Sequence, residues 1–316
     1  MSKRDYIKEI LEIRERIGKR PAFLGAFLRL LDIKYMITNN NDNYSEIYRY
    51  CPVGLVACIE SYFREVVKEL IDSGNPYFER ASQLNIEKYD FNIVSAIQGQ
   101  IVTLGDIISH LISINNINDI NKTMCKLLDE DFFKVLKNVE EHYPWKSRSS
   151  RSNKRVISDI NVIINDLKKI FEIRHIICHE FAFQIKISKE EAISFIDSVE
   201  LFLSATNFLI TEILFKEIPD TQYERNIYFN EKYKTANKQM EKLLDDAKSI
   251  FDQERLSNFK KLQSVWESYR DNDAKFVADY YKGGTIQPQV LSQRLLYLTE
   301  KRTIEIKRIF EIFNDY

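Results

Sequence analysis

The sequence predicts an all-α protein, and three features lead to that expectation. Only 8 glycines and 6 prolines occur in 316 residues, whereas these two types together make up roughly 12% of an average chain. Sandwiches, barrels and doubly wound α/β folds need frequent tight turns, so this scarcity argues against them. The chain is 44% hydrophobic and 29% charged, which suffices for a core and excludes wholesale disorder. In several segments apolar residues recur every three or four positions, as on the buried face of a helix.

The helices expected before residue 80 follow from this periodicity and from the residues that interrupt it. A first helical stretch covers about 3–36, with an interruption near 18–21. Pro52 is expected in the first turn of the next helix, where its missing N–H costs nothing. The turn residues at 73–76 end that helix. Its core-facing stripe consists of Val56, Ile59, Phe63, Val66, Val67 and Leu70.

The remaining expected helices divide into two groups, separated near Pro219. Two or three less regular helices fill 81–141, and a long helix follows residue 155. Ser188 and Glu191 have the spacing of a capping box and begin another helix, which ends before Pro219. Beyond it we expect three charged amphipathic helices, at about 225–249, 252–281 and 288–314. The predicted organisation is therefore an N-terminal helical domain, 1–218, and a smaller three-helix domain, 219–316.

Charge, hydropathy and cysteine content restrict the class of protein. The formal net charge is −1, so the whole chain does not attract nucleic acid, and any such binding must come from a local patch. No apolar run reaches ~18 residues, so we expect no membrane contact. The amphipathic N-terminus is unlike a signal peptide. The four cysteines form no CxxC pair, which favours a reducing, cytoplasmic setting.

One cluster of positive charge stands out, at 146–155. It contains no acidic residue, and Tyr143 and Trp145 precede it. It is either a phosphate-binding loop, with one of these aromatic rings stacked on a base, or a solvated linker. Its basic residues are Lys146, Arg148, Arg151, Lys154 and Arg155.

The candidate catalytic residues are Arg174, His175 and His179, which end the long helix after residue 155. The apolar stripe of that helix gives way at its last turn to a guanidinium and two imidazoles. A buried charge there costs several kcal/mol unless it is paired or hydrated. Histidine can exchange protons near neutral pH, and arginine matches a phosphate with a forked pair of donors. These groups suit cleavage of RNA, in which the ribose 2′-hydroxyl is the nucleophile.

The same residues resemble the R-[polar]-x-x-x-H motif of the HEPN ribonucleases. Residues 54–72 are similar to the first helix of that family, and the resemblance covers about 45–217. It implies a helical bundle that acts as a homodimer and cuts RNA without a metal or another cofactor, leaving a cyclic phosphate. It also implies a role in antiphage defence, abortive infection or toxicity, with an antitoxin, a phage trigger or a regulatory protein as partner. In this comparison Arg174 holds the phosphate, His179 is the acid or base and His175 assists, whereas Glu60 and Arg64 are supporting partners.

Three other interpretations of these residues remain open. The domain can be a non-catalytic HEPN scaffold that binds RNA, a nucleotide or a protein. The histidines can be core residues and Arg174 an ion-paired helix end. His175 and His179, four residues apart, can also share a metal, although the sequence shows no third ligand. His110 and His142 have no evident partner and are expected to be structural.

Four ordered blocks after residue 219 resemble the LprI-type lysozyme-inhibitor domain. Residues 229–233 are similar to its L-N-x-x-Y opening and 262–271 to its Q-x-x-W-x-x-Y-R-D helix. Residues 283–286 resemble its G-G-S-I turn and 298–302 its L-T-x-x-R stretch. The cysteines of secreted members are absent, which agrees with a reducing compartment and argues against lysozyme inhibition.

The expected core of this domain places Trp266 and Tyr269 against Leu295 and Leu298. Three roles for the domain remain open: a stabilising module, a sensor of a phage or cell-envelope ligand, and an oligomerisation arm that controls the nuclease.

Overall fold

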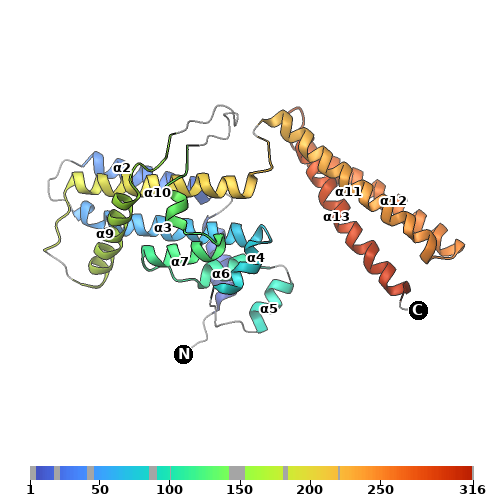
Figure 1. Cartoon of the computed structure of the whole chain (residues 1–316), viewed down its shortest axis with the longest axis horizontal. Coiled ribbons are helices and arrows are strands. Elements are labelled where there is room, and N and C mark those ends of the chain that lie inside the picture. The colour runs from blue at the N-terminus through green and yellow to red at the C-terminus, as the bar shows by residue number, and fades with distance from the viewer. Residues whose placement is uncertain are drawn as a thin grey trace. The chain divides into compact units, whose positions relative to one another are not determined.

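The computed structural model describes residues 5–17, 22–40, 46–84, 91–99, 101–141, 154–180, 184–219 and 221–314. Within these ranges the chain is all-α, as the sequence predicted, and its only β-type contact is an isolated bridge between Glu140 and Arg155. The described residues form two compact units (Figure 1). The N-terminal unit extends to Phe215 and the C-terminal unit begins at Lys216.

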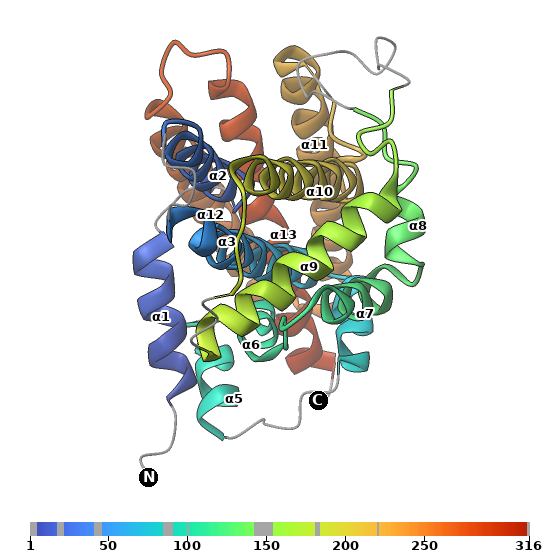
Figure 2. The ribbon, with the colours of Figure 1, turned by 90° about the vertical axis from the view of Figure 1, so that its left-hand side faces the viewer.

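The N-terminal unit is built around α3, Glu46–Asp72, which contacts α2, α6, α9 and α10. Helices α2, α3 and α10 run along one direction and α9 crosses them, as Figures 1 and 2 show from two sides. The other elements of this unit are α1 (Tyr6–Ile17), α2 (Ala22–Thr38), α4 (Tyr77–Arg80), the 3₁₀ turn η1 (Ala81–Gln83), α5 (Phe91–Gln98), α6 (Leu104–Leu111), α7 (Ile117–Leu128), α8 (Phe132–Leu136), α9 (Ile160–His179) and α10 (Lys189–Phe215).

The centre of this unit is aromatic and lies where α3, α8 and α10 meet. Phe63, Phe132 and Phe202 are fully buried, and their ring centroids are 5.3–6.3 Å apart. The predicted stripe of α3 is buried along its whole length, which confirms the expectation from its periodicity. Burial of side chains of this size contributes about 1.5–3 kcal/mol each, so these rings fix how the three helices pack.

The start of α3 differs from the sequence prediction. The helix begins at Glu46, so Pro52 lies inside it rather than in its first turn. A proline inside a helix removes one hydrogen bond and costs about 3 kcal/mol. Tyr48 and Cys51, which precede it, are buried in the core, and their burial offsets that cost. The end of α3 is as predicted, because Gly74 follows with a φ of +95° that favours glycine.

Helix α10 is long and apolar. By length and composition alone it is the one helix in the described chain that could cross a membrane. Half of its apolar window is buried inside the unit, and the helix contacts α2, α3 and α9. A helix buried in a protein core can have the same length and hydropathy, and the contacts of α10 are those of a core helix. Its start agrees with the sequence, because the Glu191 N–H donates to Ser188 Oγ at 3.1 Å.

The C-terminal unit consists of three long helices, in agreement with the prediction. They are α11 (Gln222–Ile250), α12 (Gln253–Asp279) and α13 (Gln287–Asn314), and α13 contacts both of the others. A capping box begins α11, in which Thr221 and Glu224 bond reciprocally. One end of the unit is closed by Phe251, Phe259 and Phe310, whose ring centroids are 5.2–6.0 Å apart.

Candidate functional site

The predicted catalytic residues lie on the last turn of α9, where the helix leaves the core. Ile170 and Ile173 are buried, Arg174 is half-buried, and His175 and His179 are exposed. The helix ends regularly, with the Glu180 N–H donating to the carbonyl of Ile176 at 2.8 Å. The change from apolar to polar residues in the sequence therefore coincides with the change from core to surface.

Arg174 is both ion-paired and partly exposed to solvent, as expected of a charged residue at this position. Its Nη2 lies 3.5 Å from Glu60 Oε1 on α3, and its side chain is 31% exposed. The structure thus brings together Arg174 and the predicted supporting residue Glu60. A partly exposed pair at this distance contributes about 0–1 kcal/mol, so an anionic ligand can replace the carboxylate at small cost.

The two histidines of α9 face the same side of the helix. Their ring centroids are 4.8 Å apart, as expected for residues one turn apart. Within the described residues, neither imidazole forms a hydrogen bond. No group of three or more His, Cys, Asp or Glu side chains that could hold a metal occurs in the same ranges. The arrangement offers two accessible proton-transfer groups beside one guanidinium.

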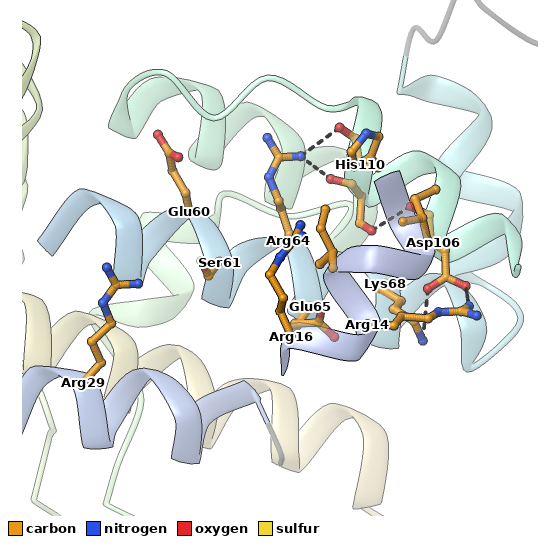
Figure 3. A pocket seen from close by; sticks show the side chains of 13 residues that line it. Arg14, Arg16, Arg29, Glu60, Ser61, Arg64, Glu65, Lys68, Asp106 and His110 are labelled. Carbon is orange, nitrogen blue, oxygen red and sulfur yellow. Dashed lines mark hydrogen bonds and ion pairs between the residues drawn. The ribbon is translucent and has the colours of Figure 1, made fainter. Parts of the chain in front are cut away.

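A cleft of about 460 Å³ lies on the other side of Glu60, between α1, α2, α3 and α6. Figure 3 shows Arg29 of α2 on one side of it, across from Glu60, Ser61 and Arg64 of α3. Positive side chains outnumber negative ones in its lining. The cations are Arg14, Arg16, Arg29, Arg64 and Lys68, and the acids are Glu60, Glu65 and Asp106.

Asp106 is the most buried acid of the cleft, with 4% of its surface exposed. Burial alone would raise its pKa, but hydrogen bonds from the Thr103 side chain and backbone, with Lys68 and Arg14 nearby, lower the pKa below its usual range. Arg14 and Asp106 form a close ion pair. Burial also raises the pKa of Glu65 above its usual range. Asp106 therefore neutralises the cations at this end of the cleft.

Arg64, the second predicted supporting residue, lies in the same cleft but is directed toward α6. Its Nη1 donates to the carbonyl of His110 at 3.0 Å and to that of Ser109. These bonds hold its guanidinium against the end of α6. The sequence predicted Arg64 on the same helix as Glu60, one turn later, and the carbonyls that it contacts follow only from the fold.

His110 was expected to lack a partner, and that expectation is wrong. Its Nε2 lies 2.9 Å from Glu9 Oε2 on α1, and its ring meets Tyr6 edge-on. Glu9 and His110 are 101 positions apart, so no local pattern could reveal the pair. His142 lies outside the described residues.

The basic run at 146–155 is described only at its end. Trp145, Lys146, Arg148 and Arg151 lie outside the described residues, as does Tyr143. Lys154 is exposed and lies 3.6 Å from Glu141 Oε1, and Arg155 forms the backbone bridge with Glu140.

The C-terminal unit has a polar network inside its three-helix packing. Arg270 is 7% exposed, and its guanidinium lies 5.6 Å from the ring centroid of Tyr233 and 5.3 Å from that of Trp266. Arg302 approaches Trp266 at 5.7 Å and donates to the buried amide oxygen of Gln263 at 3.2 Å. These five residues all belong to the blocks that resemble the LprI family. Three of the four blocks, 229–233, 262–271 and 298–302, therefore contribute side chains to one interior network.

Tyr269, in contrast, was expected in this core and is not there. It is 54% exposed, and its hydroxyl donates to Asp273 Oδ2 at 3.3 Å. Asp273 also accepts from Arg294 of α13 at 3.1 Å. Tyr269 therefore lies on the surface of α12, and the next residue, Arg270, occupies the interior instead. Leu298 is buried as expected.

Comparison with known proteins identifies the C-terminal part of the chain. Residues 216–306 match the family model described as "Lysozyme inhibitor LprI". The chain is 30% identical over 104 residues to "Uncharacterized protein R02472" of Rhizobium meliloti (strain 1021), an alignment that covers 29% of this chain and 75% of that protein. No solved structure matches the chain. Through residues 216–306, the chain therefore belongs to the LprI family.

Proposed function

We propose that the N-terminal unit is a metal-independent endoribonuclease of the HEPN type. The observation that carries the proposal is the last turn of α9, which presents Arg174, His175 and His179 together at the surface. A guanidinium beside two accessible imidazoles has the groups that phosphodiester cleavage requires. The site needs no deep pocket, since the ribose of the substrate supplies the nucleophile.

In the proposed reaction Arg174 binds the non-bridging oxygens of the scissile phosphate and displaces Glu60. The imidazole of His179 takes the proton of the ribose 2′-hydroxyl, and the 2′-oxygen attacks phosphorus. The bond from phosphorus to the 5′-oxygen breaks, and that oxygen leaves with a proton from a second imidazole. The products are a 2′,3′-cyclic phosphate and a 5′-hydroxyl, so no metal or oxidant is consumed.

The second imidazole comes from His175 or from a second copy of the chain. Because the last turn of α9 is exposed, two copies can bring these turns together about a two-fold axis. We therefore propose a homodimer joined through the N-terminal unit, which acts in the cytoplasm in antiphage defence or as a toxin. Light scattering of the purified chain measures the oligomeric state directly, and a strict monomer would contradict the composite site.

The experiment that tests the activity compares the wild type with His179→Ala on tRNA and mRNA in the presence of EDTA. The wild type is expected to cut both and to leave cyclic phosphate ends, and the variant to lose about 10²–10⁴-fold in rate, as for loss of a general acid or base. Lys168→Ala is the matched control, because it removes an exposed side chain from the same helix about three turns earlier. Expression of the wild type should arrest growth, and His179→Ala should relieve the arrest.

The alternative is a non-catalytic unit that binds RNA, a nucleotide or a protein partner. The half-exposed pair of Arg174 and Glu60 is compatible with it, since an ion pair can also serve only to hold α9 on α3. Equal degradation of RNA by the wild type and His179→Ala would support this alternative and remove the nuclease proposal.

A further inference from the structure

The lining of the cleft beside Glu60 contains both charged and apolar side chains. Its cations belong to α1, α2 and α3, whereas two isoleucines of α1, Ile10 and Ile13, also line it. Its volume of about 460 Å³ lies in the range of small-ligand sites. An apolar patch beside several guanidinium groups suits a ligand with a flat or hydrophobic part and an anionic part.

The cations of the cleft differ in whether they are already neutralised. Arg14 is paired with Asp106, and Lys68 lies 3.0 Å from Asp72 Oδ2. Arg16 has only a long contact of 3.7 Å with Glu12, and both side chains are largely exposed. Arg14 and Lys68 therefore contribute little net positive charge to the cleft.

Arg29 is the cation best placed to receive an anion. It is exposed on α2, and within the described residues it takes part in no ion pair. In Figure 3 its guanidinium is directed away from α2, toward the part of α3 that carries Glu60 and Ser61. Of the acids that line the cleft, Glu60 is paired with Arg174 at 3.5 Å and Asp106 with Arg14. An anion that enters here meets a net positive field.

Glu60 also joins this cleft to the proposed catalytic turn, because it lines the cleft and contacts Arg174. A polyanion bound at Arg174 can thus continue past Glu60 into the cleft, and its repeating phosphates would reach Arg29. A free nucleotide has the same phosphate chemistry and fits the same volume.

We propose that this cleft is a nucleotide-binding site in which Arg29 contacts a phosphate, and that it holds the RNA strand next to the phosphate bound by Arg174. The identity of the ligand as RNA rests on the proposed function. Binding of an anionic ligand in this cleft does not require that the protein cleaves RNA, so binding and cleavage are measured separately.

The test measures binding of fluorescein-labelled hexauridylate to full-length His179→Ala protein by anisotropy, so that the probe is not cut. Arg29→Gln, added to this background, is expected to weaken binding about 3- to 10-fold and to reduce the slope of log affinity against log salt by about 0.7. Lys122→Gln is the matched control, since it removes one positive charge from an exposed site on α7 of the same unit. It should change the affinity less than about 1.5-fold. Melting temperatures of all variants verify folding.

A second arm titrates AMP into the same proteins by calorimetry and separates the two sources of phosphate. Arg29-dependent binding of hexauridylate supports an RNA strand in the cleft, and Arg29-dependent binding of AMP alone supports a free nucleotide there. If Arg29→Gln and Lys122→Gln weaken both probes equally, or neither does, the proposal is overturned. A wild type that binds through Arg29 but never cuts RNA would refute the nuclease and leave this site standing.

Discussion

Arg270 is the residue of the C-terminal unit whose loss we expect to be most damaging. It is nearly buried on α12 and lies between Tyr233 and Trp266. Arg270→Ala removes a charged group from the centre of the three-helix packing and leaves the polar atoms that faced it without a donor. The acceptor Asn237 Oδ1 is half-buried and loses a charged donor.

The magnitude follows from the contacts of the guanidinium. Its Nη1 donates to Asn237 Oδ1 at 2.9 Å, and a hydrogen bond to a charged group contributes about 1.5–3 kcal/mol. The two aromatic contacts add about 0.5–1 kcal/mol each. The contact with Asp271 lies at the surface, where Asp271 is 50% exposed, and adds little. We therefore expect Arg270→Ala to lower the free energy of unfolding of this unit by roughly 3–4 kcal/mol.

Hydrogen exchange of the full-length protein, read by mass spectrometry, measures this loss locally. Peptides from α11, α12 and α13 should exchange roughly 10²- to 10³-fold faster in the variant, whereas peptides from α3 should not change. Arg308→Ala is the control, because Arg308 is exposed on α13, and its effect should stay within about 0.5 kcal/mol. Exchange within about threefold of the wild type in Arg270→Ala would refute the idea that this network holds the helices together.

Three further predictions concern the N-terminal unit. Gly105→Ala should destabilise it by about 1–3 kcal/mol in urea unfolding, because an added Cβ would lie 2.5 Å from Asp72 Oδ1 and 2.7 Å from the Lys68 carbonyl; an unchanged midpoint would contradict this. Tyr62→Phe should be neutral or stabilising by about 1 kcal/mol, since the Tyr62 hydroxyl is buried and finds no hydrogen-bond partner in the described structure; a clear loss of stability would show a partner. Burial alone would raise the pKa of Asp106, but the hydrogen bonds and cations around it lower the pKa. Unfolding at low pH therefore takes up a proton at Asp106. The stability that the ionised carboxylate supplies is present above about pH 4 and is lost as the pH falls further. Asp106→Asn should flatten stability against pH below about pH 4 relative to the wild type, and parallel curves would disprove the assignment.

The helices themselves were largely readable from the sequence. The stripe of α3 and the three charged helices after Pro219 appear where their periodicity placed them, because a helix that buries one face must repeat apolar residues every three or four positions. Pro52 shows the limit of such rules. Local propensity favours proline at a helix start, but burial of the turn before it outweighs that preference.

The candidate site was readable in part. The order Arg174, His175, His179 lies on one helical turn, so helix geometry alone places these residues together. Their exposure, and the contact of Arg174 with Glu60 across 114 positions, depend on how α9 packs on α3. The cleft around Arg29 gave no sequence signal, since its cations come from three helices with no common spacing.

The sequence by itself determined the all-α class, the approximate positions of the long helices and the resemblance of residues 229–302 to the LprI domain, because each depends on spacing within a few turns. Tertiary structure alone decided that Arg270 rather than Tyr269 faces the interior, that His110 pairs with Glu9, and that Glu60 lies between Arg174 and a positive cleft. Those outcomes depend on which helix faces contact one another. Packing between segments that are distant in sequence decides these contacts, because it buries apolar surface while the buried polar groups must still find hydrogen-bond partners.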